Sequence, residues 1–349
     1  MKFLKIITSV FALFLLNSCS EDYKILESVN EIFVTADNSF TLINNEITFS
    51  TQTINGDDIT SESTFYVNGE LLVGNTFTSS IVGDYTITSK YSGVISNPIT
   101  VTFHDGTQVN FRKRVLIEDY TGTWCGYCTR VAYAIEQVNT LTDDAVTVAI
   151  HRSSSIPTNS NYDPYNYDTS ALENLFPISG YPKGLLNRFT QWTTPQENNL
   201  SQVTALTQGE NPKLGLAMTT AVSGNNMDIE VNVKFSNNFS NLKLVVYVLE
   251  NGLIYPQKNY TSYYGGINPL PNYVHNHILR SCITDLLGDA IDGTETTSGN
   301  IYTRTFSLPI PANVTSENIE FVAFIVDENG NAINVRKASK NEAQEFEEL

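Results

Sequence analysis

Hydrophobic and polar residues alternate along the first third of the chain, in short runs such as residues 47–51 and 99–103. Turn-forming pairs, for example Asn68-Gly69, separate these runs. Alternation with a period of two predicts half-buried β-strands. Short strands that follow one another in this way predict an immunoglobulin-like β-sandwich over residues 19–105.

The middle third has a different pattern. Val115–Ile117 is a short apolar run, residues 126–139 place apolar side chains at helical spacing, and Ala145–Ile150 is a second apolar run. A buried strand, a helix and a second buried strand in this order predict a parallel α/β unit. We assign this unit to a domain over residues 106–208.

Alternation returns in the last third, for example over residues 229–235 and 244–248. Near its end the chain has a predicted hairpin, with the turn at Asn329-Gly330. These patterns predict a C-terminal β-sandwich over residues 209–349. The fold class expected for the whole chain is therefore multidomain α+β.

Residues 1–18 have the pattern of a signal peptide. Basic residues precede a mostly apolar stretch from Ile6 to Leu16, which is too short to span a bilayer. The sequence from Leu16 to Cys19 resembles a lipobox, which implies that Cys19 is acylated and anchors the chain to outer-membrane lipid. The alternative is an ordinary secretory signal with an incidental cysteine. The acidic residues after Cys19 resemble a surface-export signal, and both a periplasmic and a surface-exposed location stay open.

Acidic side chains outnumber basic ones by 37 to 20, which gives a formal net charge of −17. We expect no nucleic-acid partner, because phosphate contacts need clustered lysine and arginine. The acidic surplus is concentrated in residues 19–105, whose only basic residues are Lys24 and Lys90. The charge therefore characterises the predicted N-terminal sandwich more than any candidate site.

Cys125 and Cys128 stand where the first buried strand of the middle third turns into the helix. At a helix N-terminus, unpaired N–H groups and the helix dipole favour the thiolate form of a cysteine. A thiolate attacks disulfides, and a second cysteine one turn further on can resolve the mixed disulfide. The pair therefore predicts thiol–disulfide exchange, with Cys125 attacking and Cys128 resolving.

The segment Trp124-Cys-Gly-Tyr-Cys128 resembles the active-site motif of the thioredoxin superfamily. The resemblance implies a thioredoxin-like α/β fold for residues 106–208 and a buried carboxylate that accepts a proton from the resolving thiol. Asp119 has the spacing of that carboxylate. Glu118 is the alternative, because strand alternation lets only one of the two face the helix. A solvated acid at the sheet edge is the remaining interpretation.

The same resemblance implies a cis-proline opposite the cysteines, where the backbone of the preceding residue pairs with a substrate chain. The candidate is Pro182, which follows Tyr181; an ordinary trans proline is the alternative. Trp124, Tyr181, Pro182 and His151 are thus the expected substrate-binding residues. His151 qualifies because it follows a parallel strand, although a surface histidine is an equally good interpretation.

Three segments are similar to those of the outer-membrane-protein-28-related lipoproteins of Bacteroidetes, namely residues 118–128, 180–188 and 273–280. This resemblance covers about residues 110–337. It implies a location in the outer membrane rather than a defined activity.

The other cysteine and histidine residues add little chemistry. No second Cys-x-x-Cys accompanies the first, and His275 and His277 are distant in the sequence, so we expect neither a metal site nor a cofactor. Cys282 lies between apolar neighbours, which predicts a buried core residue. A transient partner for Cys125 is the alternative role of Cys282.

The expected function is that of a lipid-anchored thiol–disulfide oxidoreductase of the cell envelope, with exported protein thiols or disulfides as partners. The alternative is a non-catalytic outer-membrane lipoprotein for surface binding or adhesion, with a structural disulfide between Cys125 and Cys128. The tyrosine-rich segments 161–167 and 260–264 would then carry recognition. Whether the chain is an enzyme stays open at this stage.

Overall fold

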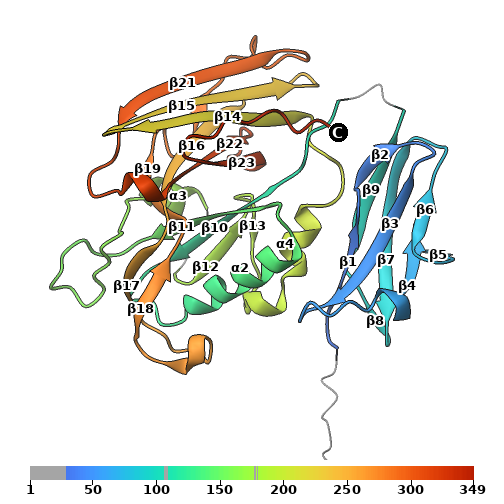
Figure 1. Ribbon diagram of the computed structural model, residues 1–349, viewed down its shortest axis with the longest axis horizontal. Helices are drawn as coiled ribbons and strands as arrows, with labels where there is room; N and C mark the ends of the chain where they lie inside the picture. Colours follow the sequence, from blue (N-terminus) through green and yellow to red (C-terminus); the bar gives the residue numbers. More distant parts are fainter. Residues whose placement is uncertain (1–28, 106–108, 177, 179) are drawn as a thin grey trace, which may run out of the picture. The chain divides into compact units, whose positions relative to one another are not determined.

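The computed structural model describes residues 29–105, 109–176, 178 and 180–349 (Figure 1). The predicted signal peptide and the predicted lipidation residue Cys19 lie outside the described residues. Residues 31–349 form one compact unit. Among the residues described, no helix combines the length and the apolar character needed to cross a bilayer.

Two sheets form from the first third of the described chain, and they share one apolar core. Phe49 from one sheet and Phe65 and Phe103 from the other are among its buried residues. The predicted alternation is present in the longer strands, whose buried positions recur every second residue. One sheet has the order β1-β3-β6 and the other β2-β9-β7-β4-β5, with β8 on β7. Their bounds are β1 (Ile32–Ala36), β2 (Phe40–Leu42), β3 (Glu46–Thr53), β4 (Thr64–Val67), β5 (Glu70–Leu72), β6 (Thr76–Thr78), β7 (Gly83–Tyr91), β8 (Val94–Ile95) and β9 (Ile99–His104).

A nine-stranded sheet dominates the rest of the chain, with the order β13-β12-β10-β11-β19-β16-β22-β23 and β20 on β16. The pairs β10–β11 and β11–β19 are parallel, and the other pairs are antiparallel. The strand bounds are β10 (Val115–Thr121), β11 (Ala145–His151), β12 (Lys183–Leu186), β13 (Thr190–Gln191), β16 (Lys243–Glu250), β19 (Ile278–Cys282), β20 (Asp289–Ala290), β22 (Ile319–Val326) and β23 (Ala332–Ser339).

The predicted fold class is wrong. Among the described residues no separate thioredoxin-like α/β domain is present, because β11 pairs with β19 from the last third of the chain, with Ala149 opposite Ile278. The described residues are mostly β and contain three α-helices, α2 (Thr129–Leu141), α3 (Ser170–Leu175) and α4 (Ser201–Leu206). Periodicity reports which faces of a strand are buried, but it does not report which distant strand lies beside it. Where each domain begins and ends stays a prediction.

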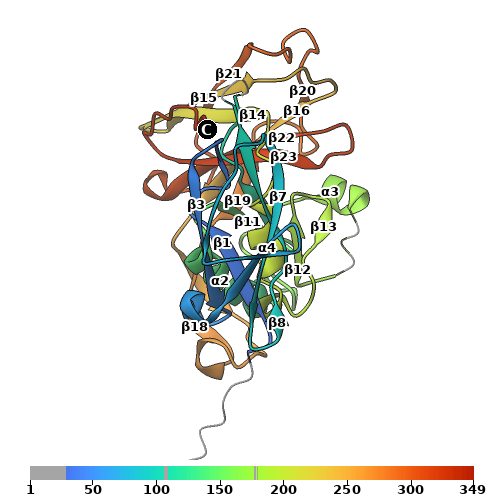
Figure 2. The same cartoon turned by 90° about the vertical axis from the view of Figure 1, so that its right-hand side faces the viewer.

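A three-stranded sheet covers one face of the C-terminal strands, as the turned view in Figure 2 shows. It consists of β14 (Leu214–Ser223), β15 (Asn226–Phe235) and β21 (Ile301–Pro309) in that order. The core between the two sheets includes Leu216, Val231 and Phe321. The strands predicted for the last third thus exist, but β16, β19, β20, β22 and β23 share their sheet with the strands of the middle third.

The hairpin of β17 (Leu253–Gln257) and β18 (Leu270–His275) projects beside α2, where the candidate site lies (Figure 1). Its strands pair only with one another in the described part of the chain. The hairpin is therefore held to the rest of the protein by side chains and by the loop between its strands.

Candidate functional site

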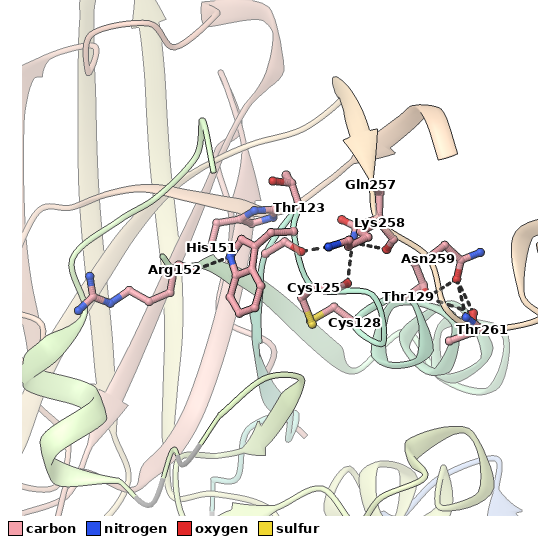
Figure 3. Close-up of a disulfide and its surroundings, with 12 residues drawn as sticks. Thr123, Cys125, Cys128, Thr129, His151, Arg152, Gln257, Lys258, Asn259 and Thr261 are labelled. Carbon is pink, nitrogen blue, oxygen red and sulfur yellow. Dashed lines mark hydrogen bonds between the residues drawn. A yellow bond between two sulfur atoms is a disulfide. The ribbon is translucent and has the colours of Figure 1, made fainter. Parts of the chain in front are cut away.

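The two cysteines of the motif form a disulfide in the turn between β10 and α2 (Figure 3). Cys125 is 4 % exposed and Cys128 is 2 % exposed. Helix α2 begins at Thr129 with Cys128 as its N-cap, so Cys125 lies in the turn that leads into the helix. The reason is local, because Cys125 and Cys128 donate backbone hydrogen bonds to Gly122 and Cys125, respectively, and these bonds close two tight turns before the helix begins.

A five-residue segment that starts at the last residue of β17, residues 257–261, lies over this turn and is called here the covering segment. Gln257 Nε2 donates to the carbonyl oxygens of Gly122 and Cys125 at 3.2 and 3.0 Å. The backbone N–H of Lys258 donates to Thr123 O at 2.9 Å. Figure 3 shows the labelled residues of the covering segment beside the disulfide. The carbonyl groups of the turn are therefore satisfied by a segment that is distant in sequence.

The end of the covering segment binds the first turn of α2. Thr129 Oγ1 donates to Asn259 Oδ1 at 2.9 Å, and it lies 3.1 Å from Thr261 Oγ1. Tyr260 N–H donates to Gly126 O at 2.6 Å, and its ring packs where a side chain at Gly126 would lie. The covering segment thus holds the turn from both ends of the Cys125–Cys128 loop.

Asp119 and Glu118 lie on opposite faces of the sheet, as strand alternation requires. Asp119 lines the cavity under α2, and its Oδ1 has no hydrogen-bond partner. Burial raises the pKa of the Asp119 carboxyl to about 8. Of the two candidate carboxylates, Asp119 is therefore the one that lies on the side of Cys128, which lines the same cavity.

Glu118 faces the other side and pairs with Arg188, with both side chains fully buried and 3.1 Å between Nη2 and Oε1. Tyr247 donates to Glu118 Oε1 at 3.2 Å and accepts from Arg188 Nη2. Burial lowers the pKa of Arg188, but Glu118, with further contributions from Tyr247 and Tyr120, outweighs burial, and the net pKa is raised. Glu118 is thus part of an ion pair in the core and has no contact with the disulfide turn in the structure.

His151 is buried at the end of β11, and its Nδ1 lies 2.9 Å from Asp163 Oδ2. The same carboxylate oxygen accepts from the backbone N–H of Thr123 at 2.8 Å. Burial raises the pKa of Asp163, but the hydrogen bond and the charge of His151, together with backbone hydrogen bonds from Thr123 and Tyr165, outweigh burial and lower the net pKa. The interpretation as a surface histidine is therefore wrong, and His151 supports the turn through Asp163 rather than by direct contact.

Trp124 and Tyr181, two of the predicted substrate-binding residues, are in contact. Their ring centroids lie 5.8 Å apart, and the Tyr181-Pro182 peptide bond is cis, which confirms that expectation. Trp124 Nε1 donates to Arg152 O at 3.0 Å, while Tyr181 donates to Glu173 Oε1 at 3.3 Å. Burial raises the pKa of Tyr181. Their role in substrate binding stays a prediction.

The remaining cysteine and the histidine pair show no joint metal site. Within the described ranges, no group of three or more ligating side chains could hold a metal ion. His277 Nδ1 pairs with Glu320 at 2.7 Å, and His275 Nε2 lies 3.2 Å from Tyr255 O. Cys282 is a free, partly buried cysteine, and burial raises the pKa of its thiol to about 11. Cys282 therefore fits the predicted core residue better than a reactive thiol.

Five tyrosines from α2, its preceding turn and the loop after β17 form two groups of packed rings, which together we call the tyrosine face. Tyr127 and Tyr260 are each about half exposed, and their ring centroids lie 5.6 Å apart. Tyr133 stacks on Tyr263 at 4.1 Å, and Tyr264 lies edge-on to Tyr133 at 6.5 Å. The sequence singled out residues 260–264, but nothing in the spacing indicates that α2 supplies Tyr127 and Tyr133 as their partners.

This fold is similar to those of two solved structures. The chain resembles the solved structure of HBP35 of Porphyromonas gingivalis, with a TM-score of 0.52, 20% identity, and coverage of 67% of this chain and 77% of that chain. It also matches a domain of the outer membrane lipoprotein Omp28 from Porphyromonas gingivalis at a TM-score of 0.27 and 16% identity, over 38% of this chain and 92% of that chain. No curated protein matches the sequence.

A family model described as outer membrane protein Omp28 matches residues 169–344. The match covers half of the chain, including the covering segment and Pro182, while the disulfide turn lies before it. The predicted location at the outer membrane is thereby confirmed. The chain belongs to the Omp28 family of outer membrane proteins.

Proposed function

We propose that this chain is a non-catalytic binding lipoprotein of the outer membrane, anchored through acyl chains on Cys19, and that its Cys125–Cys128 disulfide is structural. Family membership supports the location, and the covering segment supports the role of the disulfide.

The observation that carries this proposal is the covering of the disulfide. A thiol–disulfide exchange requires an incoming thiolate to reach one of the two sulfur atoms. Both cysteines are buried here, and three backbone carbonyls of their turn accept hydrogen bonds from Gln257 and Lys258. Exposing a sulfur atom would therefore require the turn to move, and its hydrogen bonds to the covering segment, worth about 1 kcal/mol each, oppose that movement.

The disulfide also has a clear structural task. It closes the loop that carries Gly126 and Tyr127, and Tyr260 packs on that loop through its ring and its backbone N–H. Tyr127 and Tyr260 are the exposed part of the tyrosine face, and each carries a cation near its ring, Arg130 at 5.5 Å and Lys258 at 5.6 Å. Exposed tyrosines supply large contact areas with little loss of conformational entropy, which favours recognition over catalysis.

Reduction kinetics of the full-length protein in non-ionic detergent test this proposal. We expect dithiothreitol to reduce the folded protein much more slowly than the urea-unfolded protein. We also expect the native protein to catalyse reduction or isomerisation of a protein disulfide no faster than a Cys125→Ser variant. Turnover above that variant would overturn the proposal and favour exchange with exported protein thiols or disulfides.

A further inference from the structure

A cavity of about 150 Å³ lies between α2, the end of β10, β11 and the hairpin strand β18. Its inner wall includes Asp119 and Thr147 from adjacent strands, and its outer wall includes Tyr273 and His275. Glu136 of α2 stands at the mouth, because its side chain is exposed. The cavity is thus polar inside and bounded by aromatic side chains.

Two buried acceptors in this cavity have no partner. Asp119 Oδ1 and Thr147 Oγ1 are shielded from solvent, and the residues are 4 % and 7 % exposed. The register of the parallel pair, with Ile117 opposite Thr147 and Asp119 opposite Ala149, places both side chains on the face that α2 covers. An unsatisfied buried polar group is costly, so two on one wall indicate bound water or a ligand with hydrogen-bonding groups.

The charged groups of the cavity lining determine whether a cation or an anion would bind. Its titratable residues are Asp119, Glu136, His151, Tyr273, His275 and His277, and the described lining contains neither lysine nor arginine. His151 and His277 already pair with Asp163 and Glu320. Burial lowers the pKa of His275 to about 4, with the charge of His151 acting in the same direction, so His275 is neutral at pH 7. Glu136, which accepts from Tyr264, and Asp119 are therefore the groups that can give the lining a negative charge, and Asp119 does so only as the pH rises to about 8 and above.

The aromatic side chains of the lining restrict the chemical class of the ligand further. The rings of Tyr273 and His275 lie 4.8 Å apart at one wall, and Tyr264 lies edge-on to Tyr273 at 5.4 Å. Burial raises the pKa of Tyr273 to about 12, so its ring stays neutral. Neutral tyrosine rings attract an organic cation through their π-electrons. A carboxylate floor with an aromatic wall fits a cation that has both N–H donors and a short apolar part.

We propose that this cavity binds a small primary ammonium ion with an apolar substituent, whose N–H groups donate to Asp119 Oδ1 and Thr147 Oγ1. The proposal is independent of the role of the disulfide, because it uses neither sulfur atom as a reactant. Binding of the cation favours the charged form of Asp119, so affinity rises as the pH increases toward and above the pKa of that carboxyl.

Calorimetric titration of the full-length protein in non-ionic detergent with tert-butylammonium chloride tests this inference. We expect saturable binding at one site, and at least about tenfold weaker binding at pH 6 than at pH 9. tert-Butanol has nearly the same shape without the charge and should bind at least about tenfold more weakly at pH 9. Equal affinity for the alcohol, or no saturable binding of the ammonium ion, would overturn the proposal and leave a water-filled cavity.

Variants locate the site. Asp119→Asn should weaken binding of tert-butylammonium about tenfold or more, and Thr147→Val should weaken it several-fold. Thr51→Val is the matched control, because Thr51 Oγ1 is also buried and unpartnered but lies in β3, away from the cavity lining. Unchanged affinity in Asp119→Asn, with an unfolding transition like that of the native protein, would place the cation elsewhere and contradict the assignment.

Discussion

Tyr260 lies directly on Gly126. A Cβ atom built on Gly126 would meet Tyr260 Cδ2 at 2.3 Å, and the Tyr260 N–H donates to the carbonyl oxygen of Gly126. No side chain can occupy that space unless the ring moves. The contact joins the middle of the disulfide loop to the covering segment, and it depends on the absence of a side chain at one position.

Replacing Gly126 by alanine should therefore destabilise the protein by about 1–3 kcal/mol, because the methyl group displaces the Tyr260 ring. Adding Tyr260→Ala should recover part of that loss in the double variant. Urea unfolding of the full-length protein measures both. Gly293→Ala is the control, since a Cβ at Gly293 meets no atom within 4 Å. A loss no greater than that of Gly293→Ala would show that the covering segment does not lie on the turn.

Gln257→Glu should open access to the disulfide. The substitution keeps the shape of the side chain but replaces the N–H donor that faces the carbonyl groups of Gly122 and Cys125 by an acceptor. Loss of such buried hydrogen bonds costs about 1–3 kcal/mol, so we expect dithiothreitol to reduce the variant about tenfold faster or more. The exposed Gln191→Glu serves as the comparison, and an equal rate in the two variants would argue against the role assigned to Gln257.

Removing the disulfide should cost stability without removing the fold. Closing the short loop from Cys125 to Cys128 restricts the unfolded chain by about 2 kcal/mol. The Cys125→Ser, Cys128→Ser double variant should therefore unfold at lower urea concentration with an unchanged dependence on urea. Circular dichroism measures this unfolding transition. We expect the double variant to have the same unfolding free energy as the native protein after its disulfide has been reduced. A variant that fails to fold at all would mean that the disulfide is essential to the sheet and not only to the loop.

Asp119 makes the stability of the protein depend on pH. Its pKa in the folded protein is raised to about 8, above the value of about 3.9 in an unfolded chain. Between these values the folded state holds one proton more than the unfolded state, so this group's contribution to stability falls as the pH rises. Asp119→Asn has no carboxyl to titrate, so its stability does not fall with pH for this reason. The unfolding free energy of the variant minus that of the native protein should therefore increase by about 1.4 kcal/mol per pH unit.

Urea unfolding of both proteins at several values between about pH 5 and pH 8 measures this difference. Asp58→Asn is the control, since Asp58 is exposed and its pKa is lowered by hydrogen bonds to Thr60. A constant difference across the range would show that the Asp119 carboxyl is already ionised in the folded protein.

The Glu118–Arg188 pair is a second target, on the opposite face of β10. Arg188→Met should destabilise the protein by about 3–5 kcal/mol, because it leaves a buried carboxylate without its counter-charge. The double variant Glu118→Gln, Arg188→Met should lose much less than the sum of the two single changes. Unfolding free energies of the four proteins give the coupling, and additive losses would contradict a direct buried pair.

Local features of the site follow from the sequence because they depend on short-range geometry. The period of two in β10 separates Asp119 from Glu118, and the change to helical spacing after the cysteines locates α2. The position of the disulfide turn between them is therefore predictable, and so is the two-faced character of the strand. The assignment of these elements to a separate thioredoxin-like domain is wrong for a different reason.

The strand that pairs with the second edge of β11 comes from a distant part of the chain, and the hydrophobic pattern of β11 itself does not indicate which strand this is. Strand β19 comes from the last third of the chain, and the covering segment reaches the turn from beyond β17. Gln257 and Asn259 are ordinary polar residues in the sequence, and only the folded chain shows that they bind Gly122 and Thr129. His275 likewise joins the wall of the Asp119 cavity, although the two residues are distant in sequence.

The pairing of β11 with β19 has a consequence for export. A chain that crosses a membrane from its N-terminus delivers Ala149 well before Ile278, its partner across the sheet. Until then β11 has one unpaired edge, with the hydrogen-bonding groups of an apolar strand open to any other strand. The edge of β11 that β19 covers in the folded protein is therefore open to other strands until residues 278–282 have followed residues 145–151 across the membrane.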